Sequence, residues 1–503
     1  MADEPVRYGT PAARWVLVAT IVGSGIAGLD ATVVNVALPT IGRDFGAGVS
    51  GLQWVITGYL ITLAALILLG GSLGDLFGRR RVFVTGVVWF SVASLLSGVA
   101  VNLPMLIAAR ALQGIGGALL VPGSLAIIES SFAASDRGRA IGAWSGLGGI
   151  ATAIGPFAGG WLVSAVSWRL IFLLNLPLAA VVLWASRHVP ESSDPPADRH
   201  LDLSGAALVV VGLASSTYAL IESTTPGQGP VVAATGVVGV AALAAFVLVE
   251  RRSPHPMLPV GIFSSRQFTA ANLATFFVYA ALSGALFLLA VDLQQALHYS
   301  PVAAGAALFP VTVIMLLFSS RAGALAQRIG PRIPMTVGPM IVTVGLLLMR
   351  WISPGSHYAT VTLPAVVVFG LGLALTVAPL TATVMAAADQ RYAGVASGVN
   401  NAVARAAGLL AVALLPALAG LKGADYRHPA AFSRGFHAAL VYAAAGTFAG
   451  GVLAFLGIRN PLPVGTDEGA TAPTAGGTRC RPLQATPTGC PVDGPMIRRP
   501  PAA

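Results

Sequence analysis

One carboxylate lies deep inside the first apolar segment of this sequence. Asp30 falls within the string Leu29 to Pro39, where most neighbours are apolar. A charge at such depth costs on the order of 2.5–3.5 kcal/mol on insertion scales, so it usually marks a functional site. Burial favours the protonated form of a carboxyl group in general, which makes Asp30 a candidate for a reversible proton carrier. The alternative is a permanent pair with an arginine that holds two helices together.

An arginine inside the fourth apolar segment is the candidate partner of Asp30. Arg110, Gln113, Gly114 and Gly117 are spaced i, i+3, i+4, i+7, which places them on one helix face. At a rise of ~1.5 Å per residue, Asp30 and Arg110 lie at similar depths below the outer ends of their helices. The sequence therefore predicts that the two groups communicate. An ionised Asp30 would attract Arg110, and a protonated Asp30 would release it.

A short polar turn separates the second and third apolar segments. Its chemistry-bearing residues are Gly71, Asp75, Gly78, Arg79 and Arg80. Glycine permits close approach of the two helices, and an acid beside a helix start accepts from its free N–H groups. Arginines favour the cytoplasmic side of a membrane, so we expect an inner gate loop on that side. A hairpin that is merely well anchored is the alternative.

The fifth apolar segment carries small residues at helical spacing around one proline. They are Gly155, Pro156, Gly159 and Gly160. A groove of small residues lets another helix pack closely, and a proline bends its own helix. Close packing by itself explains this pattern.

Polar and aromatic residues inside several apolar segments are candidates for a substrate cavity. They are Asn35, Trp54, Tyr59, Gln113, Tyr279, Asn400, Asn401 and Arg405. Aromatic rings suit flat or lipophilic molecules, although ordinary packing is the alternative. Three further acids near helix ends, Glu129, Glu222 and Asp292, are expected to be solvated at the membrane interface.

The composition requires membrane-spanning elements to position these residues. Charged residues are 10% of the chain and apolar residues 55%, whereas soluble domains average roughly 25% charged residues. The sequence predicts an all-α polytopic membrane protein with fourteen helices. The expected spans are 15–38, 52–71, 82–101, 103–128, 139–163, 169–187, 203–222, 231–249, 268–290, 301–320, 333–350, 359–386, 393–419 and 435–457. The first span is too long for a signal peptide.

The basic residues predict the orientation of these helices. With the N-terminus inside, the cytoplasmic segments and both termini carry 21 basic residues and the outer segments 6. This asymmetry favours an even number of helices with both termini cytoplasmic. The net charge of +10 is spread over alternate loops, so it does not indicate nucleic acid as a partner.

A weak internal repeat predicts the domain organisation. Residues 321–332 follow the tenth expected helix much as the turn follows the second, with Gln327 in the place of Asp75. The predicted parts are a cytoplasmic N-terminus 1–14, a six-helix bundle 15–187, linkers with inserted helices seven and eight 188–266, a second bundle 267–458, and a disordered cytoplasmic tail 459–503. Repeats of this kind place a substrate site at their interface near mid-membrane.

The sequence carries no sign of an enzyme. It has no phosphate-binding loop of the G-x-x-x-x-G-K-[ST] type, no cluster of metal ligands and no nucleophile–base pair. Its two cysteines, Cys480 and Cys490, both lie in the tail. We therefore expect no enzymatic activity, no metal and no cofactor.

Several of these strings resemble the motifs of the major facilitator superfamily of transporters. The turn resembles G-x-L-a-D-r-x-G-r-r, with Leu76 where a basic residue is common. The string from Arg110 matches R-x-x-Q-G-x-G at every position, and Gly155 to Gly160 is similar to the antiporter motif, with Ala151 in place of its first glycine. Strings similar to fourteen-helix drug:proton antiporters are Leu29 to Pro39, Gln53-Trp54 with Tyr59, Trp168 to Asn175, and Ser397 to Ala402.

The resemblance implies a proton-driven antiporter in the plasma membrane. It would export small lipophilic, cationic or antibiotic-like molecules by alternating access, as a monomer whose partners are the substrate, protons and the lipid bilayer. Asp30 would carry the proton, Arg110 would couple it to the cavity, and the Gly155–Pro156 region would seal and bend between states. Two alternatives stay open: an exporter of one dedicated metabolite or lipid-like product, and a transport-inactive membrane receptor or assembly factor.

Overall fold

The computed structural model describes residues 6–193, 201–254, 256–387, 393–422, 425 and 428–460. The α-helices are α1 (Pro11–Phe45), α2 (Val49–Phe77), α3 (Arg79–Gly98), α4 (Leu103–Ser131), α5 (Ala134–Ala165), α6 (Leu170–Leu173), α7 (Asn175–Ser186), α8 (Leu203–Glu222), α9 (Gly229–Arg252), α10 (Arg266–Gln295), α11 (Pro301–Ile329), α12 (Arg332–Met349), α13 (Leu363–Ala386), α14 (Ala393–Leu418) and α15 (Pro429–Gly457). A 3-10 turn, η1 (Val260–Ser264), precedes α10 and a π turn, η2 (Tyr358–Thr362), precedes α13.

The prediction of an all-helical membrane fold is confirmed. Each of the fourteen expected spans contains helix in the described residues, and several helices extend beyond the expected ends. Twelve helices there are long and apolar enough to cross a membrane, and two shorter apolar stretches lie at Ile154–Ala165 and Leu170–Ser186. Most of the tail, residues 461–503, lies outside the described part.

The sixth expected helix is broken into α6 and α7. Pro177 lies four residues after Leu173, the last residue of α6. Proline lacks an N–H group, and its ring clashes with the carbonyl four residues earlier, so the helix breaks at that point. The break leaves Asn175 at the start of α7, where its side chain enters the site described below.

Side-chain caps set the starts of several long helices. Thr10 Oγ1 accepts from Ala13 N at 3.3 Å, Asn102 Oδ1 from Met105 N at 2.9 Å, and Ser300 Oγ from Ala303 N at 3.2 Å. Proline follows each of these caps at the first or second helical position. Each cap side chain accepts from a backbone N–H that has no partner within the helix. Proline lacks an N–H, so it leaves no unpaired donor in the first turn.

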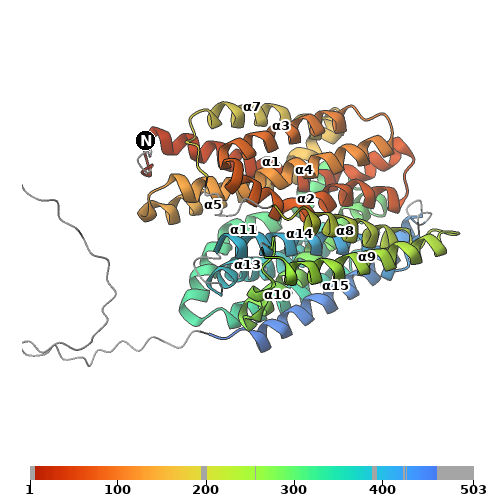
Figure 1. Cartoon of the computed structure of the whole chain (residues 1–503). Helices are drawn as coiled ribbons and strands as arrows, with labels where there is room; N and C mark the ends of the chain where they lie inside the picture. Colours follow the sequence, from red (N-terminus) through yellow and green to blue (C-terminus); the bar gives the residue numbers. More distant parts are fainter. Residues whose placement is uncertain are drawn as a thin grey trace, which may run out of the picture. The chain divides into compact units, whose positions relative to one another are not determined.

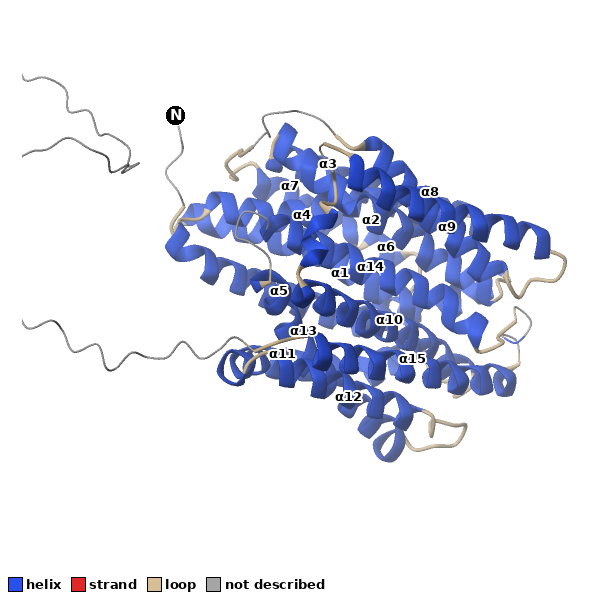
Figure 2. Ribbon diagram, turned by 60° about the horizontal axis from the view of Figure 1, so that its bottom comes forward, coloured by secondary structure: helices blue, strands red, loops and turns tan. Residues whose placement is uncertain are grey.

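Figure 1 shows α1–α5 and α7 gathered on one side and α10, α11, α13 and α15 on the other. We call these groups the N-terminal half (α1–α7) and the C-terminal half (α10–α15). Helices α8 and α9 pack against each other, and α8 also contacts α2 and α14. Figure 2 shows the same grouping after rotation. The inserted pair therefore flanks the junction of the two halves.

The helices run back and forth between two ends. The start of α1 and the end of α15 lie at one end, here called the terminal end, and the loops α1–α2 and α14–α15 lie at the opposite end. Two glutamines link the halves near the opposite end. Gln53 Nε2 donates to Val412 O at 2.7 Å, and Gln294 Nε2 donates to Val36 O at 2.9 Å. Both amides are buried, so this end of the junction is closed.

Candidate functional site

A buried ion pair joins α1 to α4. Arg110 Nη1 donates to Asp30 Oδ2 at 2.6 Å, and each side chain is 1% exposed. Gln113 Nε2 donates to the other carboxylate oxygen, Oδ1, at 2.9 Å. A carboxylate taken out of water is tolerated when it is paired and hydrogen-bonded in this way. The structure thus places Asp30 and Arg110 in direct contact.

Two small polar residues complete the pair's surroundings. Ser94 Oγ accepts from Gln113 Nε2 at 2.8 Å and from Asn175 Nδ2 at 3.1 Å. Asn175 Nδ2 also lies 3.4 Å from Asp30 Oδ1. Ser94 and Asn175 were not among the predicted site residues, although Asn175 ends the antiporter-like string that begins at Trp168. We call Asp30, Arg110, Gln113, Ser94 and Asn175 the carboxylate network.

An aromatic ring covers the arginine of this network. The guanidinium carbon of Arg110 lies 4.4 Å from the ring centroid of Tyr59 on α2, within the range of a cation–π contact. Arg110 Nε donates to Val55 O at 3.2 Å. The Tyr59 hydroxyl is buried and has no hydrogen-bond partner among the described residues.

Glycines of the Arg110 string bring α4 close enough to make these contacts. A Cβ atom at Gly114 would lie 2.2 Å from Tyr59 O on α2, and one at Gly116 would lie 2.6 Å from Phe90 N on α3. Any side chain there would push α4 away from α2 and α3. The glycines therefore serve helix packing, and Arg110 and Gln113 carry the chemistry.

The polar turn is held by Glu191, which follows α7. Within the turn, Arg79 Nε donates to Asp75 Oδ1 at 2.9 Å. The Glu191 carboxylate accepts from Arg80 N at 3.0 Å and from Arg81 N at 3.2 Å. A carboxylate at this position pairs free N–H groups in the first turn of α3 and complements the helix dipole. Sequence reasoning missed Glu191.

The two equivalent turns of the halves share this architecture. Gly78 (φ +106°) separates α2 from α3, and Gly330 (φ +84°) separates α11 from α12. Asn460, which follows α15, accepts from Arg332 N at 3.1 Å. Glu191 and Asn460 thus occupy corresponding places after the last helix of each half.

Gly78 should be intolerant of any side chain. Its positive φ favours glycine, and an added Cβ would lie 2.7 Å from Glu191 Oε1. We expect Gly78→Ala to destabilise the protein by about 1–3 kcal/mol, seen as a lower midpoint in thermal unfolding of the detergent-solubilised chain. Gly74→Ala is the matched control, because its Cβ would meet its nearest atom, Arg79 Cα, at 3.8 Å. Equal midpoints for the two variants would contradict this explanation of Gly78.

The glycines of α5 face two helices of different halves. A Cβ at Gly155 would lie 2.1 Å from Thr32 Oγ1, and one at Gly159 would lie 2.6 Å from Val33 Cγ1, both on α1. On α11, Pro301 O would lie 2.6 Å from a Cβ at Gly160.

The contact between α5 and α11 is reciprocal. A Cβ at Gly305 on α11 would lie 2.2 Å from Pro156 O on α5. Helix α5 is therefore wedged between α11 and the turn of α1 that carries Asp30. Gly305, like Glu191, was not among the residues predicted from the sequence.

The predicted cavity residues fall into three groups. Tyr59 and Gln113 are buried in and beside the carboxylate network. Trp54 Nε1 donates to Glu222 Oε1 at 3.1 Å, and Asn400 Oδ1 accepts from Thr275 Oγ1 at 2.8 Å. The remaining candidates are partly exposed and lie on α1, α10 and α14: Asn35, Tyr279, Asn401 and Arg405.

The expectation that Asp292 is solvated is wrong. Asp292 lies in the last turns of α10 with 0% exposure, and Ser433 on α15 lies beside its carboxylate. The sequence placed it near a helix end but did not reveal that α15 covers it. Glu222 and Glu129 are partly buried.

A carboxylate outside the spans caps the inserted pair. Asp202 Oδ1 accepts from Gly205 N at 2.7 Å and from the Ser204 hydroxyl at 2.8 Å. Burial raises the pKa of Asp202, but these hydrogen bonds outweigh burial and hold the pKa below its usual range. Asp202 therefore keeps its charge near neutral pH and stabilises the start of α8.

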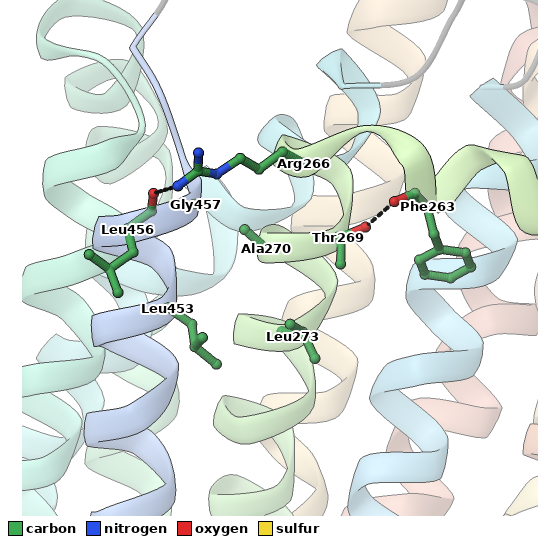
Figure 3. Close-up of a pocket in the computed structure, with 8 residues that line it drawn as sticks. All are labelled: Phe263, Arg266, Thr269, Ala270, Leu273, Leu453, Leu456 and Gly457. Carbon is green, nitrogen blue, oxygen red and sulfur yellow. Dashed lines mark hydrogen bonds between the residues drawn. The ribbon is translucent and has the colours of Figure 1, made fainter.

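A crevice of about 320 Å³ opens between α10 and α15 (Figure 3). Its lining is mostly apolar, and Arg266 Nη2 donates to Leu456 O at 2.7 Å at one edge. The predicted site residues do not line it. It lies at the terminal end, away from the carboxylate network.

Comparison with known proteins adds independent findings. The family described as Major Facilitator Superfamily matches residues 20–413. The chain is 36% identical over 409 residues to the puromycin resistance protein pur8 of Streptomyces alboniger, covering 80% of this chain and 81% of that protein. It is 36% identical over 391 residues to the multidrug resistance protein Stp of Mycobacterium tuberculosis, covering 77% and 72%. The tetracenomycin C resistance and export protein of Streptomyces glaucescens is 32% identical over 433 residues, covering 84% and 80%.

Solved structures share the fold. A bacterial homolog of the human lysosomal transporter Spinster aligns with a TM-score of 0.63 at 15% identity, covering 89% of this chain and 97% of that chain. A peptide transporter POT in complex with sulfate aligns with a TM-score of 0.65 at 14% identity, covering 89% and 94%. At these identities the likeness concerns the fold alone.

Proposed function

The chain belongs to the Major Facilitator Superfamily, and from this premise we propose that it is a proton-coupled antiporter that exports small lipophilic drugs or antibiotics. Membership makes it a multi-pass membrane transporter and not an enzyme, as its sequence predicts. The names of its relatives, which include resistance and export proteins, support the direction and the substrate class. The observation that best supports proton coupling is the buried ion pair between the Asp30 carboxylate and Arg110.

We place fourteen helices across the membrane, with both termini in the cytoplasm. Twelve of the described helices meet the length and composition of a span. The other two crossings are α5, whose 32 residues are long enough to span, and the broken pair α6–α7. The matching turns at Gly78 and Gly330 support two six-helix bundles at 15–187 and 267–458, joined by the inserted pair. The terminal end then faces the cytoplasm. The membrane that the helices cross is the plasma membrane.

The carboxylate network supplies a chemical mechanism for proton coupling. In its ionised form Asp30 holds Arg110 through Oδ2 and Gln113 through Oδ1. A proton on Asp30 removes the charge that attracts Arg110. The guanidinium then keeps its contacts with Gln113, Val55 O and the rings of Tyr59 and Phe172. Proton binding thereby loosens the link between α1 and α4.

Helix α5 supplies a path from this network to the other half. Gly155 and Gly159 seat α5 on Thr32 and Val33, within one turn of Asp30. On its other side α5 packs against α11 through Gly160 and Gly305. A small shift of α1 is therefore transmitted to the contact between the halves, because closely packed helices move as units.

The closed opposite end corresponds to one state of an alternating-access cycle. Gln53 and Gln294 bridge the halves there, and this end faces outward in the proposed orientation. Export requires that these bridges break in the outward-open state while the terminal end closes. The turn at Asp75–Arg80 is the proposed inner gate at that end.

Two other functions share part of this evidence. A dedicated exporter of one metabolite or lipid-like product would use the same network and fold. A transport-inactive receptor or assembly factor would not need Asp30, which is costly to bury. A panel of unrelated compounds separates a multidrug exporter from a dedicated one.

Reconstituted transport tests the proposal. The full chain in liposomes with an imposed pH gradient should move several compounds of a panel that contains ethidium, puromycin and unrelated antibiotics. Transport should cease when an ionophore collapses the gradient. Transport that continues without the gradient would reject proton coupling, and movement of one chemical class alone would favour the dedicated exporter.

A further inference from the structure

The crevice between α10 and α15 combines an apolar lining with a positive charge at one edge. Its lining residues are Phe263, Arg266, Thr269, Ala270, Leu273, Leu453, Leu456 and Gly457. Leu273 and Leu456 are 42% and 58% exposed, so the crevice opens on the outer surface of the helices. In a membrane protein, apolar side chains on that surface face lipid.

The crevice runs from the terminal end into the membrane. A Cβ atom at Gly457 would lie 2.3 Å from the Ala270 Cβ, so the two helices touch closely there. Leu273 follows Arg266 by seven residues on α10, which is ~10 Å along a helix. Figure 3 shows Leu273 and Leu453 on the same side of Arg266, one on each helix. A crevice of this length and lining suits the first part of an acyl chain.

Two guanidinium groups lie at the edge of the crevice nearest the terminal end. Arg266 Nη2 donates to Leu456 O at 2.7 Å, and Arg332 Nε donates to Phe455 O at 2.9 Å. The Arg332 guanidinium carbon also lies 4.2 Å from the centroid of the Phe455 ring. Because the two acceptors are adjacent residues in the last turn of α15, both guanidinium groups lie at this turn.

Capping of α15 accounts for only part of what these arginines offer. Basic side chains often pair the free carbonyls at a helix end, and each arginine makes one such bond. A guanidinium has five N–H donors, so both arginines keep donors for a ligand. In the part of the chain that the structure describes, the ion pairs all involve other arginines. The edge of the crevice therefore carries two positive charges without a described counter-ion.

We propose that this crevice binds one anionic phospholipid. Its phosphate accepts hydrogen bonds from Arg266 and Arg332, and one acyl chain lies between Leu273 and Leu453. Arginine donates to phosphate with strong, charge-assisted hydrogen bonds, and basic pockets between membrane helices attract anionic lipid headgroups. A zwitterionic headgroup fits less well, because its ammonium group is repelled by the two arginines. This site is separate from the carboxylate network and does not depend on the proposed transport activity.

The bound lipid would join α10 to α15 at the terminal end. Its headgroup contacts arginines at the starts of α10 and α12, and its chain contacts α10 and α15. A ligand that binds only the folded arrangement stabilises that arrangement. We therefore expect anionic lipid to hold these three helices of the C-terminal half together.

Native mass spectrometry of the purified full chain in a neutral detergent measures lipid binding directly. Dioleoyl-phosphatidylglycerol should bind the wild type roughly 10-fold more tightly than dioleoyl-phosphatidylcholine, which has the same chains without the net charge. Arg266→Gln removes a charge-assisted hydrogen bond and should weaken phosphatidylglycerol binding by about 10- to 100-fold. Arg266→Lys keeps the charge and should weaken it less. Arg332→Gln should act in the same direction as Arg266→Gln.

Two matched controls separate the site from general effects of charge and surface. Arg321→Gln removes another exposed arginine, which lies in the last turns of α11 and donates to Leu317 O of its own helix. It should leave phosphatidylglycerol binding unchanged. Leu273→Trp fills the crevice and should weaken binding, whereas Leu317→Trp, at an exposed position on α11, should not. If Arg266→Gln does not fold, Arg266→Lys and Leu273→Trp decide by the same criterion.

Three results would overturn the inference. They are equal binding of the two lipids by the wild type, equal phosphatidylglycerol binding by the wild type and a folded Arg266→Gln, and equal losses in Arg266→Gln and Arg321→Gln. A further arm tests the role of the acyl chain. Glycerol 3-phosphate, at the same concentration as the lipid, should not displace phosphatidylglycerol. Displacement would show that a free phosphate group occupies the site and would overturn the assignment to a lipid.

Discussion

Asp30→Asn is expected to reduce gradient-driven efflux to the level of protein-free liposomes. Asparagine is nearly the same size, but it cannot ionise and so cannot exchange the proton that the cycle needs. It also leaves Arg110 without its anion, and removing one partner of a buried pair costs about 3–5 kcal/mol. Asp30→Glu, which keeps an acid at the same position, should retain measurable efflux.

A double variant separates proton coupling from a purely structural pair. Asp30→Asn with Arg110→Gln removes both buried charges, and thermal unfolding should show that much of the lost stability returns. Under the proton-carrier account, gradient-driven efflux stays absent even though the fold is restored. Recovery of both stability and gradient-driven efflux would identify Asp30 and Arg110 as a structural pair.

Gly160→Leu is expected to abolish transport by preventing closure of the opposite end. An added Cβ would lie 2.6 Å from Pro301 O on α11, so the two halves cannot approach as they do here. Overpacking costs about 1–3 kcal/mol, which shifts a two-state equilibrium by roughly 5- to 150-fold toward the outward-open state. Gly305→Leu should act in the same way from the other side.

Distances between spin labels report this shift. Labels at Val166 and His298, which are exposed at the opposite end, follow the separation of the halves once Cys480 and Cys490 are replaced by serine. The distance should increase in Gly160→Leu. Gly142→Leu is the control on the same helix, because a Cβ there meets nothing within 4 Å. An unchanged distance with intact transport in Gly160→Leu would show that this contact does not seal the protein.

The apolar pattern was sufficient to predict the helices. Long runs without charge have few alternatives to a spanning helix, because the bilayer offers backbone groups no other partners. The sequence predicted that Asp30 and Arg110 lie at similar depths and communicate, but it did not predict their direct contact, which also requires that α1 and α4 lie close together. The length of a helix does not determine how far apart two helices lie in the membrane plane. Close packing of α4 on α2 and α3 depends on Gly114 and Gly116, where a side chain would clash.

The residues that escaped prediction lack a distinctive local pattern. Ser94 is one serine among several in α3, and serine is common in membrane helices. Glu191 lies in an irregular segment where no period fixes which way a side chain points. Asp292 was wrongly expected to be exposed to solvent. The α15 residue beside it, Ser433, lies more than a hundred residues later in the chain. Long-range packing decides such positions.

The most direct test of proton antiport measures the counter-movement of protons. A pH-sensitive dye is trapped inside liposomes that hold the full chain, with no imposed gradient, and ethidium or puromycin is added outside. Inward movement of the compound should drive protons outward, so the internal pH should rise in the wild type and stay constant in Asp30→Asn. Uptake of the compound with no change in internal pH, or with a fall, would contradict the account.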